Sequence, residues 1–403
     1  MEPVIKFVSQ NITSPNWKQR YSALLSLGAI TEGPDKMQFM NVVMPGLQNL
    51  ISMFTDVHAK VREALGWLMS RICEHHADVV SNEQSIAIII PMFLRALLDK
   101  PKVANQVCCA IENLATSLAP QTEDQRANAL TFYFNDIFSA LFVVAYRQDS
   151  DAGVDLPLAS FSALSALTEF CCVDSCPVIY EKLVPLLQQI EATINGHELG
   201  ETKAKMFQDF LAGLLQIMLV KIGSKLDEVI ANNIVQLLIM IFNKQGKVTE
   251  CGLIAYSGLC NGIGAKINVK DFGQYIVWAL KGSDDECVRL ACGLISDIAD
   301  ALKEHTGAYM NDFVPPLIQI LKAAEQDRFT KLQAIVALGD LAMNCSNAFT
   351  SNYLPDVLSV LDSAARQSVN TMEFHDDPDI LEYLAKLRET LIECYTTIVH
   401  GVK

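Results

Sequence analysis

The feature that most constrains this chain is a repeat of about 42 residues. Gly28 in SLGAI and Ser70 in LMSRI lie 42 residues apart, and so do Ser70 and Glu112 in AIENL. Further on, Ser296 in LISDI and Gly339 in ALGDL lie 43 residues apart. A period of about 40–47 residues is typical of stacked helix pairs. One such pair cannot bury its apolar side alone, so neighbouring pairs must pack against one another.

The stretch from Asp56 to Glu74 shows the form of this repeat. The acidic turn residue Asp56 precedes Val61-Arg62, and the helical positions that follow carry an apolar stripe of Val61, Leu65, Leu68 and Ile72. At about 100° per residue, these four side chains share one helix face. An acidic turn followed by Val-Arg is the HEAT form of the repeat. The sequence therefore predicts an all-α fold, a right-handed α-solenoid of about nine HEAT repeats.

Each repeat is expected to hold a first helix and a second helix that run antiparallel. The expected pairs are 2–11 with 14–31, 35–55 with 57–75, 84–99 with 101–119, 127–147 with 154–173, 176–194 with 200–221, 226–243 with 246–264, 269–282 with 284–303, 305–323 with 326–345, and 349–368 with 378–400. They are expected to form a single continuous array over residues 1–403. Because neither end shows a polar capping repeat, we expect a fragment of a longer solenoid.

Composition narrows the classes of function. The net charge of −15 disfavours nucleic acid as a direct ligand, because that ligand requires a basic face. The acidic balance favours basic partners, or simply solubility. Twelve cysteines without small-domain spacing indicate reduced core residues of a cytosolic or nuclear protein. No signal peptide opens the chain, and Pro91 and Arg95 interrupt the apolar run at 85–98, so we expect a soluble protein without membrane insertion.

No group of residues predicts catalysis. The run from Cys73 to His76 (CEHH) offers metal-type ligands, but adjacent histidines at a helix end point in different directions, which favours a solvated helix terminus. Gly262-x-Gly264 follows a helix and not a strand, so it is typical of a helix terminus rather than a dinucleotide loop. We therefore expect a protein that is not an enzyme and has no catalytic residue, cofactor or metal.

Trp67 is the residue that most suggests a binding surface. It lies about 130° from the centre of the apolar stripe, on the polar side of its helix. A large aromatic side chain there needs a partner, either the neighbouring helix or a ligand. If second helices line an inner, concave face, the candidate binding residues are Trp67, Glu63, Arg71, Glu74, Gln106, Glu112, Asn113, Asp297, Asp300, Asp340 and Asn344.

Such a surface suits a long basic peptide. Carboxylates pair with Arg and Lys heads, indole takes an alkyl stem or a guanidinium, and amides bind the peptide main chain. The alternative is that these residues bond across neighbouring second helices and stabilise the array. Between first helices, outer grooves are expected to accept an inserted aromatic ring. Their candidate lining residues, which are core residues in the alternative interpretation, are Phe272, Tyr275, Ile276, Leu317 and Leu321.

Several segments carry a family resemblance. They are Trp17-x-x-Arg20 through Gly28-x-Ile30-x-Glu32-Gly33-Pro34, Val61-Arg62 through Trp67 to Arg71-Ile72 and Glu74, Val103-Ala104 with Cys108-x-Ala110, and Tyr383-Leu384 with Leu387-Arg388-Glu389 and Tyr395-Thr396. In order and spacing, these segments resemble importin-β, the karyopherin-β family of nuclear import receptors. The resemblance spans essentially the whole chain.

The resemblance implies a carrier that binds the basic importin-β-binding segment of importin-α, or basic cargo, on its concave second-helix face. It also implies that Phe-Gly nucleoporins dock between outer first helices, that Ran releases cargo, and that the protein works in cytoplasm and nucleus and at the nuclear pore and envelope. Trp67 matches a family tryptophan that contacts the basic segment, whereas Cys109 stands where the family has the next tryptophan.

The resemblance also implies that this chain lacks part of the family's repeat array. The family's N-terminal repeats, which hold the principal Ran-binding surface, have no counterpart in this sequence, so we expect this chain to lack them. An alternative interpretation of the whole sequence is a HEAT-repeat scaffold of another class, of the phosphatase-scaffold or coat-adaptor type.

Overall fold

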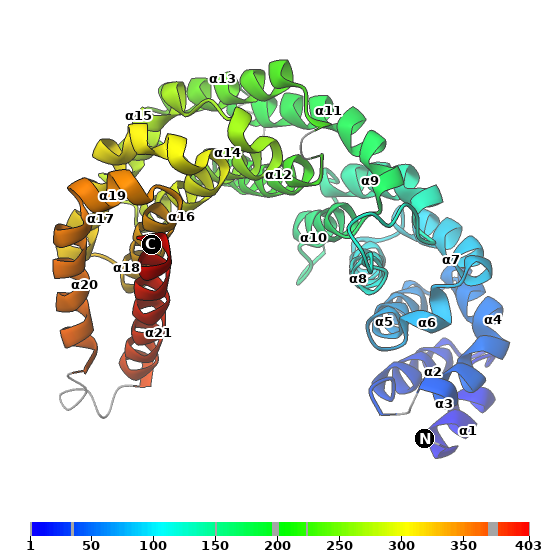
Figure 1. The fold of residues 1–403 in the computed structure, drawn as a ribbon. Helices are drawn as coiled ribbons and strands as arrows, with labels where there is room; N and C mark the ends of the chain where they lie inside the picture. The colour runs from blue at the N-terminus through cyan, green and yellow to red at the C-terminus, as the bar shows by residue number, and fades with distance from the viewer. Residues whose placement is uncertain are drawn as a thin grey trace. The chain divides into compact units, whose positions relative to one another are not determined.

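The computed structural model describes residues 2–33, 36–149, 151–195, 201–222, 225–369 and 378–402. Within these ranges every regular element is a helix and no strand occurs. The chain forms two compact units, Met1–Val184 and Pro185–Lys403. In each unit the helices form two layers, a first-helix layer and a second-helix layer, as can be followed in Figure 1.

In the N-terminal unit, four second helices pack in chain order, each on the next. They are α2 (Trp17–Ala29), α5 (Ala59–His75), α8 (Pro101–Ser117) and α10 (Leu156–Glu169). The first-helix layer holds α1 (Glu2–Asn11), α3 (Lys36–Val43), α4 (Leu47–Ser52), α7 (Glu83–Ala96) and α9 (Phe134–Ala145). The short elements between them are η1 (Met44–Gly46), η2 (Met53–Thr55), α6 (Ala77–Val80), η3 (Thr131–Tyr133) and η4 (Val173–Ser175).

In the C-terminal unit, five second helices pack in the same serial way. They are α12 (Glu201–Ile222), α14 (Glu250–Ile263), α16 (Asp285–Leu302), α18 (Arg328–Asn344) and α21 (Pro378–Gly401). The first helices are α13 (Glu228–Gln245), α15 (Val269–Leu280), α17 (Met310–Lys322) and α20 (Leu354–Val369), with η6 (Gly264–Lys266), η7 (Lys303–Tyr309) and α19 (Ser346–Asn352) as short elements. The first helix α11 (Cys176–Asn195) has residues in both units.

All nine predicted helix pairs have counterparts among these elements, so the predicted all-α solenoid is confirmed. The expected helix at 35–55 differs, because η1 and η2 interrupt it. Pro45 lies in η1, has no N–H to donate and restricts the residue before it, which breaks the regular α-helical hydrogen bonding there. The sequence also predicts a turn at Asn195-Gly196-His197 and an acidic loop at 373–379, and most of both segments lies outside the described residues.

The acidic turns and the Val-Arg motif bind neighbouring repeats together in the N-terminal unit. Arg20 on α2 holds Asp56 in the next repeat with two hydrogen bonds, Nε to Oδ2 at 2.7 Å and Nη2 to Oδ1 at 2.9 Å. One repeat later, Arg62 forms the same bidentate contact with Asp99, from Nε to Oδ2 and from Nη2 to Oδ1. In the C-terminal unit a hydrogen bond between repeats runs in the opposite sense, since Gln326 Nε2, just before α18, donates to Asp285 Oδ1 at the start of the preceding second helix at 2.6 Å.

Glycines allow the second helices of the C-terminal unit to approach one another closely. A Cβ atom at Gly258 on α14 would lie 2.7 Å from Gln216 Cα on α12, and one at Gly262 would lie 3.0 Å from the carbonyl carbon of Leu219 and nearer still to its oxygen. At α21, a Cβ atom at Gly401 would lie 2.8 Å from Met343 Cα. These contacts are with backbone, so any larger residue would have to separate the two helices.

The cysteines agree with a packed helical core. No disulfide joins any of the twelve cysteines, all of which lie within the described residues, and every one except Cys109 is buried. Among the described residues, no single helix is long and apolar enough to cross a membrane. The one combination that passes by length and composition, Leu156–Glu169 with Val173–Ile194, is bent by 119°.

Candidate functional site

Trp67 lies on α5 with its indole ring over Gly28 of α2. A Cβ atom at Gly28 would lie 2.9 Å from Cε3 of the indole and nearer still to Cζ3, so the ring fills the space that the missing side chain leaves. The Trp67 side chain keeps an intermediate exposure. The neighbouring helix is thus one partner of this aromatic, and its exposed part remains available to a second.

Arg71 and Glu74 belong to a charged cluster that connects α5 to the end of α2. Arg71 hydrogen-bonds to Glu32 through Nη2, and its Nη1 donates to Glu74 Oε2 at 3.1 Å. The hydrogen bond from Arg71 holds the pKa of Glu32 below its usual value. His75 Nε2 lies 3.6 Å from Glu32 Oε1 and 3.5 Å from Glu74 Oε2. At Arg71 the structure shows an inter-repeat contact of the alternative interpretation, whereas the contacts of Glu74 are with residues of its own helix.

Gln106 and Asn113 on α8 also contact α5. A Cβ atom at Gly66 would lie 2.8 Å from Gln106 Cβ, which places the Gln106 stem directly on the α5 backbone. The Asn113 amide donates from Nδ2 to the carbonyl oxygen and to the hydroxyl oxygen of Ser70, both at 3.1 Å. Both residues therefore help to hold the second helices of this unit together.

Glu63 and Glu112 differ from their neighbours. Of the residues that the structure describes, none forms a hydrogen bond or an ion pair with either carboxylate, although both side chains are partly buried. Burial raises the pKa of Glu112 above its usual value. A desolvated carboxylate without a counter-charge is unfavourable in the isolated chain. An added cation would supply the missing counter-charge at either position.

In the C-terminal unit, Asp297 and Asp340 are likewise carboxylates whose pKa burial raises. Asp297 on α16 accepts a hydrogen bond from Ser257 Oγ on α14 at 2.5 Å and a longer one, 3.4 Å, from Asn261 Nδ2. Asn344 on α18 donates from Nδ2 to Asp300 Oδ1 on α16 at 2.9 Å. These bonds again run from one second helix to the next.

The residues expected to line outer apolar grooves lie mostly in the core. Phe272, Ile276 and Leu317 are fully buried and Tyr275 is 7% exposed, whereas Leu321 keeps partial exposure. Phe272 stacks on Tyr256 with 3.7 Å between ring centroids. At these four positions the structure agrees with the core interpretation and not with exposed grooves, because first helices pack against their second helix and against neighbouring first helices.

One exposed aromatic on this layer was missed by sequence reasoning. Trp278 on α15 is 43% exposed and lies 6.3 Å, ring centroid to ring centroid, from Tyr275. Its position on α15, three residues after a core tyrosine, is also compatible with burial, so the sequence alone gives no signal that separates it from the core.

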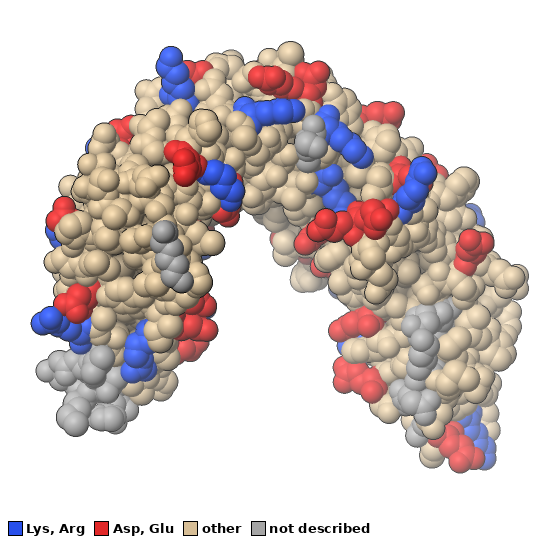
Figure 2. All heavy atoms as spheres, viewed as in Figure 1, with Lys and Arg blue, Asp and Glu red and all other residues tan. Residues whose placement is uncertain are grey.

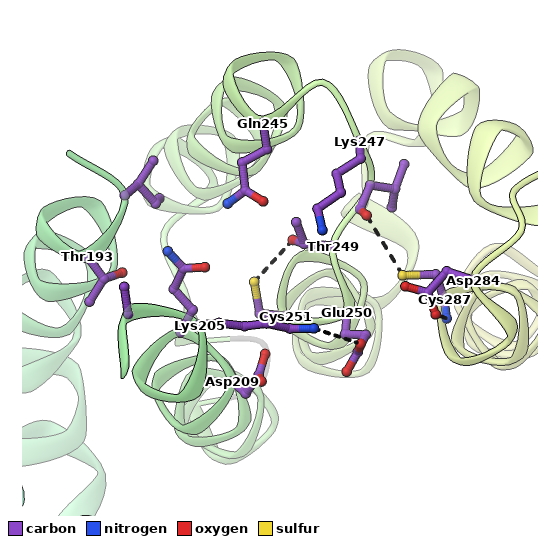
Figure 3. A pocket seen from close by; sticks show the side chains of 14 residues that line it. Thr193, Lys205, Asp209, Gln245, Lys247, Thr249, Glu250, Cys251, Asp284 and Cys287 are labelled. Carbon is purple, nitrogen blue, oxygen red and sulfur yellow. Dashed lines mark hydrogen bonds and ion pairs between the residues drawn. The ribbon is translucent and has the colours of Figure 1, made fainter. Parts of the chain in front are cut away.

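A cavity lies in the C-terminal unit, where the second helices α14 and α16 begin (Figure 3). It measures about 620 Å³. Lys205 and Glu250 lie side by side at its edge with Nζ 3.8 Å from Oε1, and Thr249 Oγ1 lies 3.1 Å from Cys251 Sγ. Burial raises the pKa of Asp209 and Glu250, and raises the pKa of the Cys287 thiol to about 12. The raised pKa keeps the Cys287 thiol protonated near neutral pH, and a protonated thiol is a poor nucleophile.

The residues near the CEHH run have structural contacts. The His76 ring is buried, stacks on Phe39 at 4.1 Å between centroids, and has Nε2 2.7 Å from the carbonyl oxygen of Thr31. Within the described ranges, no three His, Cys, Asp or Glu side chains are grouped as metal ligands would be. The described charges on the face shown in Figure 2 are of both signs and are separated by wide uncharged areas, so that face shows no basic surface of the kind nucleic acid requires.

Serially packed helix pairs with polar second-helix surfaces define a helical-repeat protein of the kind that binds partners along its length. The family model described as "Importin subunit beta-1-like, TPR repeats" matches residues 88–403. The chain therefore belongs to the importin subunit beta-1-like family. That family consists of transport receptors and is not a class of enzymes.

Individual relatives agree. The chain is 26% identical to importin subunit beta-1 of Saccharomyces cerevisiae over 411 residues, which cover 100% of this chain and 46% of the yeast protein. It is similar to a crystal structure of importin beta, with a TM-score of 0.89 and 24% identity over 100% of this chain and 47% of that one. It is also similar to the importin chain of a Kap95:Nup1 complex, with a TM-score of 0.88 and 25% identity over 99% and 46%. The chain spans about half the length of the relatives it matches.

Proposed function

We propose that this chain is part of a nuclear import receptor of the importin-β type, and that its second-helix surface binds a basic protein segment. The segment would be the importin-β-binding region of importin-α, or basic cargo. The observation that carries the proposal is the pair of partly buried carboxylates, Glu63 and Glu112, on the adjacent helices α5 and α8. No described residue neutralises either of them.

The physical argument rests on desolvation. A partly buried carboxylate loses hydration on folding, and in this unit neither Glu63 nor Glu112 recovers it through a hydrogen bond or an ion pair with a described residue. An incoming Arg or Lys head would supply the missing charge-assisted hydrogen bonds. Glu63 precedes Trp67 by about one helical turn on α5, so the exposed part of the indole lies close enough to take the alkyl stem of the same or a nearby basic residue.

Contact with Phe-Gly nucleoporins is proposed for the first-helix layer. Support comes from family membership and from the relative whose structure is a complex with Nup1. Of the five candidate residues, Leu321 is partly exposed and would contact a Phe-Gly segment directly. The other four are buried and would only support the surface that the segment contacts; they are Phe272, Tyr275, Ile276 and Leu317. Trp278 is an additional exposed aromatic on α15.

We propose further that Ran regulates this receptor, and that the receptor works in cytoplasm and nucleus and at the nuclear pore and envelope. The competing interpretation, a phosphatase scaffold or coat adaptor, does not require uncompensated carboxylates on second helices. Family membership and these carboxylates together favour the import receptor.

The test is a titration of the whole chain with a fluorescent Arg/Lys-rich peptide at two salt concentrations. We expect saturable binding that weakens as salt rises. Glu112→Gln should weaken binding about three- to tenfold, the effect of roughly 0.7–1.4 kcal/mol for one charge-assisted contact.

The matched control is Glu83→Gln, which makes the same chemical change at an exposed position on the first helix α7. It should leave the affinity unchanged. Equal losses in both variants would point to a non-specific effect of net charge, and no saturable binding at either salt would refute the proposal for this chain.

A further inference from the structure

The second helices α14 and α16 end in the same backbone turn. At the end of α14, Gly264 has φ 55° and ψ −129°, and its N–H donates to Cys260 O. At the end of α16, Lys303 has φ 53° and ψ −130°, and its N–H donates to Ala299 O. Each residue then begins a 3₁₀-helix, η6 and η7 respectively. The two positions are therefore equivalent in successive repeats.

Glycine adopts a positive φ without penalty, whereas a residue with a Cβ atom does not. Lys303 is the one non-glycine residue with positive φ among those the structure describes. Such a conformation persists where the surroundings impose it. Here the carbonyl oxygen of Lys303 accepts a hydrogen bond from Cys345 Sγ at 3.1 Å, just after the next second helix, α18. The backbone of Lys303 is thus fixed from both α16 and α18.

The strained backbone directs the lysine side chain onto the second-helix surface. Its Nζ lies 3.1 Å from Asn344 Oδ1 and 3.3 Å from Asp300 Oδ1. The Asn344 amide in turn donates to the same Asp300 oxygen at 2.9 Å. One internal cation therefore satisfies a carboxylate and an amide that belong to the candidate binding residues.

The preceding repeat has neither charge at the equivalent places. Asn261 stands three residues before Gly264, as Asp300 stands three residues before Lys303. The neutral pair of one repeat thus corresponds to a charged pair in the next. The turn does not require a lysine, because glycine forms the same turn without strain. The lysine occurs in the repeat that also has a carboxylate for its ammonium to pair with, so we relate its presence to Asp300 and not to the turn.

We infer that Lys303 is an internal competitor that occupies Asp300 and so determines where on the second-helix surface a basic segment binds. This inference rests on the proposed function. A partner cation must displace the Lys303 ammonium to reach Asp300, whereas Asp297 and Asp340 face no such competitor among the described residues. Both members of the pair are largely exposed, at 63% and 67% of their side chains, so displacement is possible and its effect on affinity is modest.

The experiment compares Lys303→Met, which removes the ammonium and keeps the strain, with Lys303→Gly, which removes both. The control is Lys266→Met, which makes the same charge change at an exposed lysine in η6 of the preceding repeat. With the Arg/Lys-rich peptide at low salt, both Lys303 variants should bind about two- to fivefold more tightly than the unmodified chain, the range for one exposed ion pair. Lys266→Met should bind as the unmodified chain does.

Two further readouts complete the test. Adding Asp300→Asn to Lys303→Met should abolish the gain in affinity, because the freed carboxylate is then gone. Lys303→Gly should melt about 2–4 °C above Lys303→Met, because it alone relieves the positive φ.

Several results would overturn the inference. They are unchanged affinity in both Lys303 variants, an equal gain in Lys266→Met, and a gain that survives Asp300→Asn. If neither the unmodified chain nor Lys303→Met binds the peptide, the proposed function fails and this inference fails with it. Binding by the unmodified chain that Lys303→Met does not change refutes the internal competitor alone.

Discussion

The contact between Trp67 and Gly28 can be tested by changing both residues. The indole of Trp67 occupies the space beside the Gly28 backbone, so Gly28→Ala would place a methyl group within 3.0 Å of several ring atoms unless the ring moves. Trp67→Ala removes the ring and opens that space. The effect of the methyl group should therefore depend on whether the tryptophan is present.

The magnitudes follow from two opposing effects. Alanine in place of glycine inside a helix gains about 0.5–1 kcal/mol. Overpacking against a ring that must shift costs about 1–3 kcal/mol. Gly28→Ala should therefore destabilise the unmodified chain by about 1 kcal/mol and stabilise the Trp67→Ala chain by about 0.5–1 kcal/mol, a coupling of about 2 kcal/mol. Trp67→Ala alone should cost about 2 kcal/mol, less than for a fully buried tryptophan, because the ring is partly exposed.

The assay is urea unfolding of the unmodified chain, Gly28→Ala, Trp67→Ala and the double variant. Unfolding is monitored by far-ultraviolet circular dichroism, because the variants alter tryptophan fluorescence. Gly213→Ala is the control, since this glycine lies within α12 and a Cβ atom there meets nothing within 4 Å. It should stabilise the chain by about 0.5–1 kcal/mol whether or not Trp67 is present. If Gly28→Ala has the same effect in both backgrounds, the indole does not pack on α2 as the structure shows.

Three further outcomes are expected. Burial alone would raise the pKa of Asp56, but the hydrogen bonds from Arg20 and from the His58 N–H lower it. The stability that the Arg20–Asp56 pair provides is therefore complete above about pH 4 and is lost as the pH falls through the lowered pKa. Asp56→Asn should cost about 1–2 kcal/mol at pH 7, and unfolding measured at decreasing pH should show the stability difference between variant and unmodified chain shrinking below about pH 4. Gly262→Ala must separate α14 from α12 and should cost about 1–3 kcal/mol in thermal unfolding. Burial raises the pKa of Glu112, so the folded chain is more stable with this side chain protonated and loses stability as the pH rises and the side chain ionises. Glu112→Gln should therefore be more stable than the unmodified chain by a few tenths of a kcal/mol at pH 7 and equally stable near pH 4.

The helix pairs could be predicted from the sequence because the repeat period and the apolar stripe are local signals. The partner of Arg62 could not be predicted in the same way. Its motif is evident, but its partner Asp99 lies 37 residues further on and is identified only when the next repeat is stacked in place. The same limit applies to Trp67, since the sequence offers no reason to choose Gly28 as the surface on which the ring rests.

The first-helix layer shows where a helical pattern is not enough. In one interpretation of the sequence Phe272 and Ile276 line exposed grooves, and in the other they belong to the core; both are fully buried. A first helix contacts its own second helix and also the first helices on either side, so much more than one face is covered. On such a helix an apolar residue outside the main stripe is as compatible with the core as with the surface, which is why Trp278 was missed.

The carboxylates of the second-helix layer separate into two groups that the sequence cannot distinguish. Asp56 and Asp99 sit at turns, are held by arginines and have lowered pKa values, so the fold accounts for them. Glu112 and Asp340 lie within helices, and burial raises their pKa values. The second group costs stability at neutral pH, and packing alone gives no reason for residues that destabilise the chain. A cationic partner does, because its binding restores the charge compensation that folding leaves out and stabilises the bound chain by mass action. The desolvation that makes these residues unfavourable in isolation is therefore the physical reason for proposing them as binding residues.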